Sequence, residues 1–220
     1  MSGPRLSLVV IVALAGCAGD ERPEPEENDV DCDPFAVDVV SFSPGEHAGF
    51  GSDRFPQIVF GPPGGGEDGG GSLDVLSLGV GGSIVVELGC AASDGDGVDL
   101  VVYENAFVVG APDTDTGAST HFVEVADVAV SADGVTFVAF ACDKPASTLA
   151  HDDGIDGCAG MATVAAGATG VFPDDGGDGF DLATVGLAEA RFVRITDRST
   201  SGSADTAGFD LDAVAAIVRD

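Results

Sequence analysis

Basic side chains are scarce in this sequence. Lys and Arg together number 8, against 38 Asp and Glu residues, and the formal net charge is -30. Nucleic acids and anionic membrane surfaces are bound through basic patches, so neither is expected as an electrostatic partner. Ion pairs cannot neutralise so many carboxylates, which leaves two interpretations: a solvated surface suited to high salt, or the binding of divalent cations.

Aromatic platforms and catalytic signatures are also missing. There is no tryptophan, and Tyr103 is the only tyrosine. A flat sugar-binding surface would depend on phenylalanines such as Phe50 or Phe55, beside His47. The chain has neither the G-x-S-x-G turn of serine hydrolases nor the H-E-x-x-H helix of zinc proteases. Carboxylate pairs of the glycosidase type indicate nothing in so acidic a chain. We therefore expect no enzyme, with a hydrolase as the last alternative.

The first residues have the pattern of an export signal. Arg5 precedes the apolar stretch 6–14, and the tetrapeptide L-A-G-C that ends at Cys17 resembles a bacterial lipobox. The resemblance implies that residues 1–16 are a signal peptide and that lipidated Cys17 anchors the mature protein by its acyl chains. Ala18, where retention in the inner membrane would favour Asp, implies the outer membrane or cell surface. An ordinary secretory signal with a chance cysteine is the alternative.

Residues 17–34 are predicted to be a disordered acidic linker. Between Asp20 and Pro34 the chain has eight acidic residues, one arginine and three prolines, with almost no apolar content. Such a segment cannot offset its ordering entropy and should form an extended tether. It would hold one folded domain, residues 35–220, away from the membrane.

Four cysteines remain once Cys17 is lipidated, an even number in an exported chain. Cys142 and Cys158 bracket a loop rich in glycine, aspartate and alanine, so we expect them to form one disulfide. Cys32 and Cys90 then form the second by elimination. Zinc binding is the alternative, but no C-x-x-C or H-x-x-x-H spacing supports it.

The domain has the pattern of short strands separated by glycine-rich turns, with no long helical period. About nine such strands predict an all-β fold, a single β-sandwich, with one short helical turn at 183–187. The expected strands are 37–42, 57–60, 72–78, 83–88, 99–103, 122–130, 136–141, 191–196 and 210–218.

One strand carries the most informative acidic residue. Residues 100–107 follow an acidic turn and are apolar on both faces, so we place this strand centrally in a sheet. Glu104 lies beside Val102, where a carboxylate needs a partner or a metal ion. The preceding turn supplies Asp96 and Asp99, although its spacing excludes an EF-hand.

A four-residue motif occurs twice in the second half of the chain. G-F-D-L at 179–182 recurs at 208–211, and Asp212 follows the second copy. On the strand period of two, Asp210 and Asp212 would share one face of the last strand, where carboxylates near Glu104 would need a cation. Hydrated acidic turns without an ion are the alternative. The predicted calcium ligands are Asp96, Asp99, Glu104, Asp181, Asp210 and Asp212.

Two stretches resemble a known fold family. Residues 128–137 (V-A-V-S-A-D-G-V-T-F) and 190–195 (A-R-F-V-R-I) resemble discoidin-like, galactose-binding-like jelly rolls, and 132–134 has the residues of a hairpin turn. The region from Phe35 to Asp220 is also similar to bacterial cell-surface lipoproteins with a D-x-x-V-x-E-N-A-F core and a G-F-D-L-D-A-V end. These resemblances imply a jelly roll that binds or adheres, often with a structural calcium ion near the first and last strands.

Together these patterns predict a surface-anchored, calcium-stabilised binding or adhesion module. Its partner would be an extracellular glycan or protein, and its contact with the membrane would be the lipid anchor alone. The alternative is a structural cell-envelope lipoprotein with no small-molecule ligand. No motif in the sequence identifies the ligand or the residues that bind it.

Overall fold

The structure is a computed structural model that describes residues 32–66, 71–110, 120–143, 149–151 and 157–219. In these residues the chain is an all-β sandwich, as the sequence predicts, with thirteen strands in three sheets. No described helix is long and apolar enough to cross a membrane. The signal peptide, Cys17 and the linker up to residue 31 lie outside the described residues.

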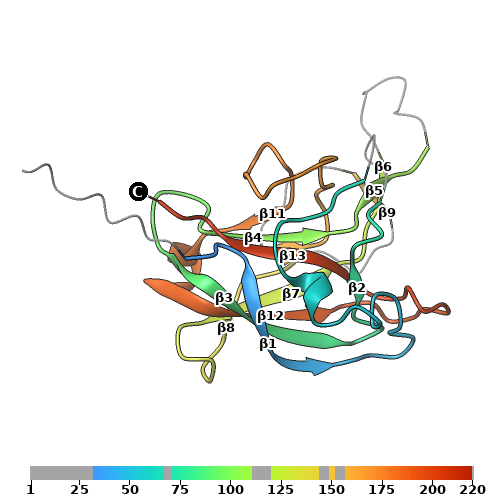
Figure 1. Cartoon of the computed structure of the whole chain (residues 1–220), viewed down its shortest axis with the longest axis horizontal. Coiled ribbons are helices and arrows are strands. Elements are labelled where there is room, and N and C mark those ends of the chain that lie inside the picture. The colour runs from blue at the N-terminus through green and yellow to red at the C-terminus, as the bar shows by residue number, and fades with distance from the viewer. Residues whose placement is uncertain (1–31, 67–70, 111–119, 144–148, 152–156, 220) are drawn as a thin grey trace, which may run out of the picture. The chain divides into compact units, whose positions relative to one another are not determined.

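The strands of the described residues pair antiparallel throughout (Figure 1). The large sheet has the order β1 (Ala36–Ser43), β3 (Ser83–Ser93), β12 (Glu189–Asp197), β7 (Ala126–Ser131), β10 (Cys158–Ala159), with β8 (Val138–Ala139) also on β7. The second sheet has the order β11 (Asp178–Phe180), β4 (Leu100–Glu104), β13 (Asp210–Ala216), β2 (Leu76–Ser77). A small third sheet contains β5 (Phe107–Val108), β6 (Thr120–Phe122) and β9 (Leu149–His151).

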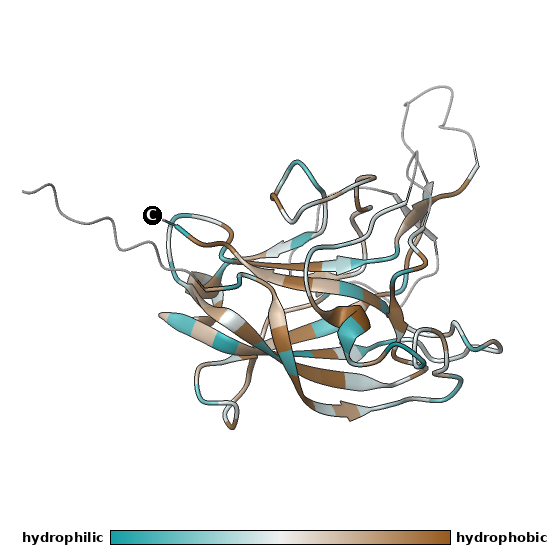
Figure 2. Ribbon diagram, viewed as in Figure 1, coloured by the Kyte–Doolittle hydropathy of each residue, from teal (hydrophilic) through white to brown (hydrophobic). Residues whose placement is uncertain are grey.

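The main core lies between the two larger sheets, and its residues follow the alternation of the strands. On β3, burial alternates residue by residue, with Ile84, Val86 and Leu88 in the core. From β12, Val193 and Ile195 face the same core. Figure 2 shows that hydrophobic residues follow these strands. The alternation visible in the sequence therefore sets which face of the large sheet is covered.

Strand β4 lies between β11 and β13, which confirms its predicted central position. All five of its residues are buried. Val102 faces the main core, whereas Val101 and Tyr103 belong to a second cluster with Val164 on the other face of the sheet. Both faces are covered, so the carboxylate of Glu104 is enclosed on all sides of this strand.

Several predicted strand boundaries are wrong. Residues 57–60 form a 3-10 helix, η1 (Gln57–Val59), because the amides of Ile58 and Val59 bond back to carbonyls in the preceding turn. The expected strand 72–78 is reduced to the two residues of β2. The expected strand 122–130 is two strands, β6 and β7, in different sheets. The expected helical turn near 183–187 is present as η3 (Leu182–Val185).

Strand β13 departs from the strict period of two. Its pairing with β4 shifts between Leu211 and Ala213, the register of a β-bulge. As a result Leu211 and Val214 both face the main core, while Ala213 faces the second cluster. The prediction that Asp210 and Asp212 share one face of a regular strand is therefore wrong, since the bulge lies between them.

Two local predictions are confirmed. The hairpin between β7 and β8 turns at Asp133 and Gly134, where Asp133 accepts hydrogen bonds from two following amides and Gly134 has φ 72°. The disulfides pair Cys32 with Cys90 and Cys142 with Cys158.

Candidate functional site

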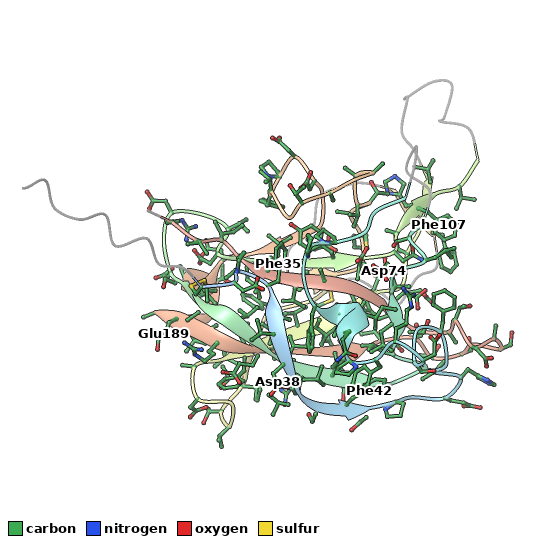
Figure 3. The ribbon with its side chains drawn as sticks, viewed as in Figure 1. Phe35, Asp38, Phe42, Asp74, Phe107 and Glu189 are labelled. Carbon is green, nitrogen blue, oxygen red and sulfur yellow. A yellow bond between two sulfur atoms is a disulfide. The ribbon has the colours of Figure 1, made fainter. Side chains whose placement is uncertain are left out.

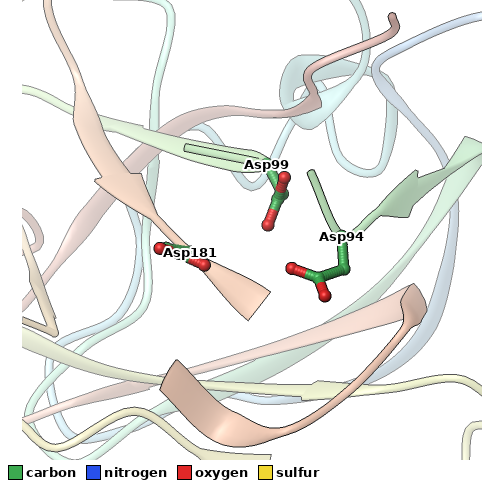
Figure 4. A group of neighbouring side chains, drawn as sticks. All are labelled: Asp94, Asp99 and Asp181. Carbon is green, nitrogen blue, oxygen red and sulfur yellow. The ribbon is translucent and has the colours of Figure 1, made fainter. Parts of the chain in front are cut away.

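Three carboxylates lie close together where β4 begins, and an arginine pairs with one of them. The carboxylate oxygens of Asp94, Asp99 and Asp181 lie within 4.8 Å of one another (Figure 4). Asp99 is fully buried, and Arg219 Nη1 donates to its Oδ1 over 2.6 Å. The backbone amide of Leu182 donates to the other oxygen of Asp99 over 2.8 Å. The ion pair of Arg219 and Asp99 therefore fastens the end of the described chain to the start of β4.

Asp181 of this group and the neighbouring Asp96 have local roles. Asp181 is the N-cap of η3 and accepts a hydrogen bond of 2.8 Å from the amide of Ala183. Asp96 is exposed, and its backbone carbonyl accepts from Arg219. Of the predicted calcium ligands, Asp99 and Asp181 thus lie in this group and Asp96 lies beside it, and Arg219 balances only one of the negative charges.

A different group of acidic residues lines a pocket at the opposite end of β4. The pocket has a volume of about 270 Å³ and is bounded by the end of β4, by β13 and by the small third sheet. Glu104, Glu124 and Asp210 line it and are buried, at 1%, 8% and 6% exposure. Phe107 and Phe122 line it too and are half-buried, with their rings stacked 5.0 Å apart. The acidic side of the pocket is therefore its inner side.

Glu104 is the most strongly perturbed of these acids. Burial, and then the charges of Asp210, Glu124 and Asp178, raise its pKa well above the usual value, although the backbone amide of Asp210 donates to it. Within the described residues, Oε2 of Glu104 has no hydrogen-bond partner. An ionised carboxylate with an unsatisfied oxygen is costly at such a position.

Glu124 and Asp210 share this environment. Burial, followed by the charges of Asp210 and Asp197, raises the pKa of Glu124 to about 8. Burial raises the pKa of Asp210 to about 6, against the effect of hydrogen bonds from Ser77 and Asn105. Among the ion pairs of the described residues, none includes Glu104, Glu124 or Asp210. This group can therefore become neutral only by taking up protons or by binding a cation.

Asp212 lies in a third environment. It accepts hydrogen bonds of 2.9 and 3.1 Å from the amide of Gly64, and one of 3.4 Å from the amide of Gly65. Burial raises its pKa to about 6, and the charge of Asp74 acts in the same direction. The partners of Asp212 thus differ from those of Asp210, as the bulge in β13 requires.

The predicted metal ligands are thus divided among three places, and only Glu104 and Asp210 lie in one pocket. Sequence reasoning missed Glu124, although Val123 and Val125 flank it in an apolar run, the same signal that singled out Glu104. Asn105 was also missed as a pocket residue. Its side chain bonds to Asp210, and its Oδ1 has no partner among the described residues.

The phenylalanines predicted as substitutes for a sugar platform lie apart. Phe50 lines the acidic pocket. Phe55 packs on Phe42 instead, with ring centroids 5.1 Å apart, and His47 Nε2 lies 3.4 Å from Oε1 of Glu46. One of the two expected rings is therefore at the pocket, where Phe107 and Phe122 add two that were not expected.

Comparison with protein-family models and with curated proteins found no match for this chain. The resemblance of residues 128–137 and 190–195 to discoidin-like jelly rolls therefore stays a prediction.

Proposed function

We propose that this protein is a lipid-anchored binding or adhesion module at the outer membrane or cell surface, with a galactose-binding-like jelly-roll domain. In this proposal lipidated Cys17 is the anchor, the residues between it and Cys32 are the tether, and a calcium ion stabilises the domain; the predicted linker 17–34 is shortened because Cys32 is bonded to Cys90. The partner is an extracellular glycan or protein, and no reaction is catalysed. The observation that carries the proposal is the pocket with phenylalanines on its accessible side and buried carboxylates on its inner side.

Cysteine pairing supports the exported location. One disulfide joins Cys32 to Cys90, and the other joins Cys142 to Cys158. Disulfides of this kind form and persist in oxidising compartments and are rare in the cytosol. The charge of -30 supports a location in contact with the external medium, where a solvated acidic surface keeps a protein soluble.

The pocket supports the binding of a small group. Its volume of about 270 Å³ lies just below the range of roughly 300–1,000 Å³ that ligand pockets occupy. We therefore expect it to accept one sugar residue or one side chain of a partner protein. The stacked rings of Phe107 and Phe122 offer the apolar contact, and the buried acids offer the polar contact.

The test uses the full chain with Cys17→Ser, applied to a glycan array in the presence of calcium. We expect this variant to move from the membrane fraction to the soluble fraction, and to be retained by a subset of glycans. Adding Phe107→Ala or Phe50→Ala should reduce retention at least tenfold. Val135→Ala, at a hairpin position that is 83% exposed, is the control and should leave retention unchanged.

Each result has a clear meaning. A Cys17→Ser variant that still sediments with membranes contradicts the anchor. An array without any retained glycan contradicts the carbohydrate ligand and is the result expected of a structural envelope protein. Retention that Phe107→Ala and Phe50→Ala leave intact places the ligand elsewhere.

A further inference from the structure

The acids of the pocket come from three segments of the chain. Glu104 is the last residue of β4, Asp210 is the first residue of β13, and Glu124 comes two residues after β6 ends at Phe122. All three line the pocket and are almost fully buried. Oε2 of Glu104 has no hydrogen-bond partner among the described residues. The inner side of the pocket therefore presents an unsatisfied acceptor, which a ligand with a donor would satisfy.

The spacing of these carboxylates does not fit a single metal ion. In the described residues, the ligand oxygens of the three acids do not all lie within 4.8 Å of one another, as those of Asp94, Asp99 and Asp181 do. Oxygens that share one calcium ion lie within about twice its bond length of roughly 2.4 Å. An ammonium group forms longer contacts, of about 2.8 Å, and so spans oxygens that are farther apart. The three buried acids therefore fit an organic cation better than a metal ion.

The more exposed part of the pocket is lined by phenylalanines. Phe107 from β5 and Phe122 from β6 are half-buried there, with ring centroids 5.0 Å apart, and Phe50 adds a third ring. In Figure 1 β5 and β6 lie together at one end of the domain, and Figure 3 marks Phe107 there. A ligand that reaches the buried acids past these rings needs its charge at the end of an apolar stem.

We propose that the pocket binds the side chain of a lysine on a partner protein, with its ammonium group among the three buried acids and its methylenes against the rings of Phe107 and Phe122. This inference rests on the proposed function and names the chemistry of the partner. Lysine has a flexible four-carbon stem and three donors that point to different sides. The donors of arginine lie in one plane instead. Three separate donors suit acceptors that come from three segments.

The charge of the pocket supports this choice of ligand. Among the ion pairs of the described residues, none includes Glu104, Glu124 or Asp210. A neutral sugar offers no positive charge to offset theirs, and an amino sugar carries its ammonium directly on the ring, without a stem. The net charge of -30 also attracts a basic partner protein to the domain.

NMR titration of the full chain with Cys17→Ser tests the ligand. The probe is Nα-acetyl-lysinamide, and the matched control is Nα-acetyl-norleucinamide, which has the same carbon stem but no ammonium. We expect the lysine compound to bind at least tenfold more tightly and to shift the amide signals of Asn105 and Glu124. Equal affinities of the two compounds, or no binding of the lysine compound, overturn the inference.

Substitutions test which acids hold the ammonium. Glu124→Gln and Asp210→Asn should each weaken binding of the lysine compound at least tenfold. Asp94→Asn, at an exposed position in the acidic group beside Arg219, is the matched control and should leave binding unchanged. Loss of binding in Asp94→Asn with retention in Glu124→Gln would move the ligand to that other group and overturn the assignment. If a pocket variant fails to fold, the comparison of the two compounds on the intact pocket decides.

The failure of this inference can be told apart from failure of the proposed function. A chain that is retained by glycans but does not bind the lysine compound overturns the lysine ligand and keeps the proposed binding function. Binding of the lysine compound without any retained glycan keeps the lysine ligand and removes the carbohydrate alternative. Glucosamine that binds as tightly as the lysine compound overturns the choice of a protein partner.

Discussion

Buried carboxylates in this protein differ in what neutralises them. Asp99 is paired with Arg219 and with backbone amides. Asp197 accepts from the amides of Gly81 and Phe209 and from Ser199. Oε2 of Glu104 has no such partner in the described residues. The first two acids hold segments of the chain together, whereas burial keeps the pKa of Glu104 well above its usual value.

The pair of Arg219 and Asp99 gives a prediction for stability. Arg219→Met leaves a fully buried carboxylate with backbone amides alone, so we expect it to lower the free energy of unfolding by about 2 to 3 kcal/mol. That figure is below the full cost of breaking a buried pair because the Arg219 side chain is 35% exposed. Urea denaturation measures the change.

Arg54→Met is the matched control. Asp74, the ion-pair partner of Arg54, is 58% exposed. Breaking this pair should therefore lower the free energy of unfolding by less than about 1 kcal/mol. Equal effects of the two variants would contradict the stabilising role assigned to Arg219.

Strands could be predicted from the sequence where the strand was long enough to show a repeating pattern of apolar residues. The sequence of β3 shows the alternation of buried and less buried residues, and the sequences of β4 and β12 show their apolar faces. The two- and three-residue strands of the third sheet have no such pattern, because their pairing partners come from distant segments. The bulge in β13 depends on its register with β4. The apolar neighbours of Glu104 were therefore enough to predict that it is buried. The different surroundings of Asp210 and Asp212 could not be predicted, because they depend on the bulge.

The two disulfides should stabilise the domain to different degrees. Cys32 and Cys90 are 58 residues apart, and Cys142 and Cys158 are 16 apart. Loop-closure entropy predicts a loss of about 4 kcal/mol for Cys32→Ser with Cys90→Ser, and about 3 kcal/mol for the other pair. Denaturation of the two double variants in urea checks this order, and the reverse order would contradict it.

Charge across the whole molecule makes the acidic pocket sensitive to pH. The net charge of -30 repels itself more strongly as carboxyl groups ionise. In the pocket, the raised pKa of Glu124, about 8, and of Asp210, about 6, means that the folded state holds protons which the unfolded state releases. At the surface the sign is opposite, because hydrogen bonds from Thr136 and Val135 lower the pKa of Asp133 to about 2.

In EDTA we expect the free energy of unfolding to rise as the pH increases from 2 and to fall again between about pH 5 and pH 8. The rise comes from groups with a lowered pKa, such as Asp133, and the fall from Glu104, Glu124 and Asp210. Urea denaturation at each pH measures both trends.

Glu124→Gln serves as the control for this pH dependence. Removing the group with a pKa of about 8 should flatten the fall in EDTA. Glu189→Gln, at an exposed position on β12, should leave the fall unchanged. A stability that keeps rising from pH 5 to pH 8 in EDTA would contradict the raised pKa values of the pocket.

The disulfide between Cys32 and Cys90 has a mechanical consequence. It joins the start of the described chain to β3, whose neighbours in the large sheet are β1 and β12. Tension applied through the residues before Cys32 therefore enters at the second strand and bypasses the edge strand β1. The force is then shared by the hydrogen bonds of β3 with β1 and with β12, and β1 is not pulled off the sheet from one end. A domain pulled through the residues before Cys32 would strain the interior of its large sheet before β1 separated from β3.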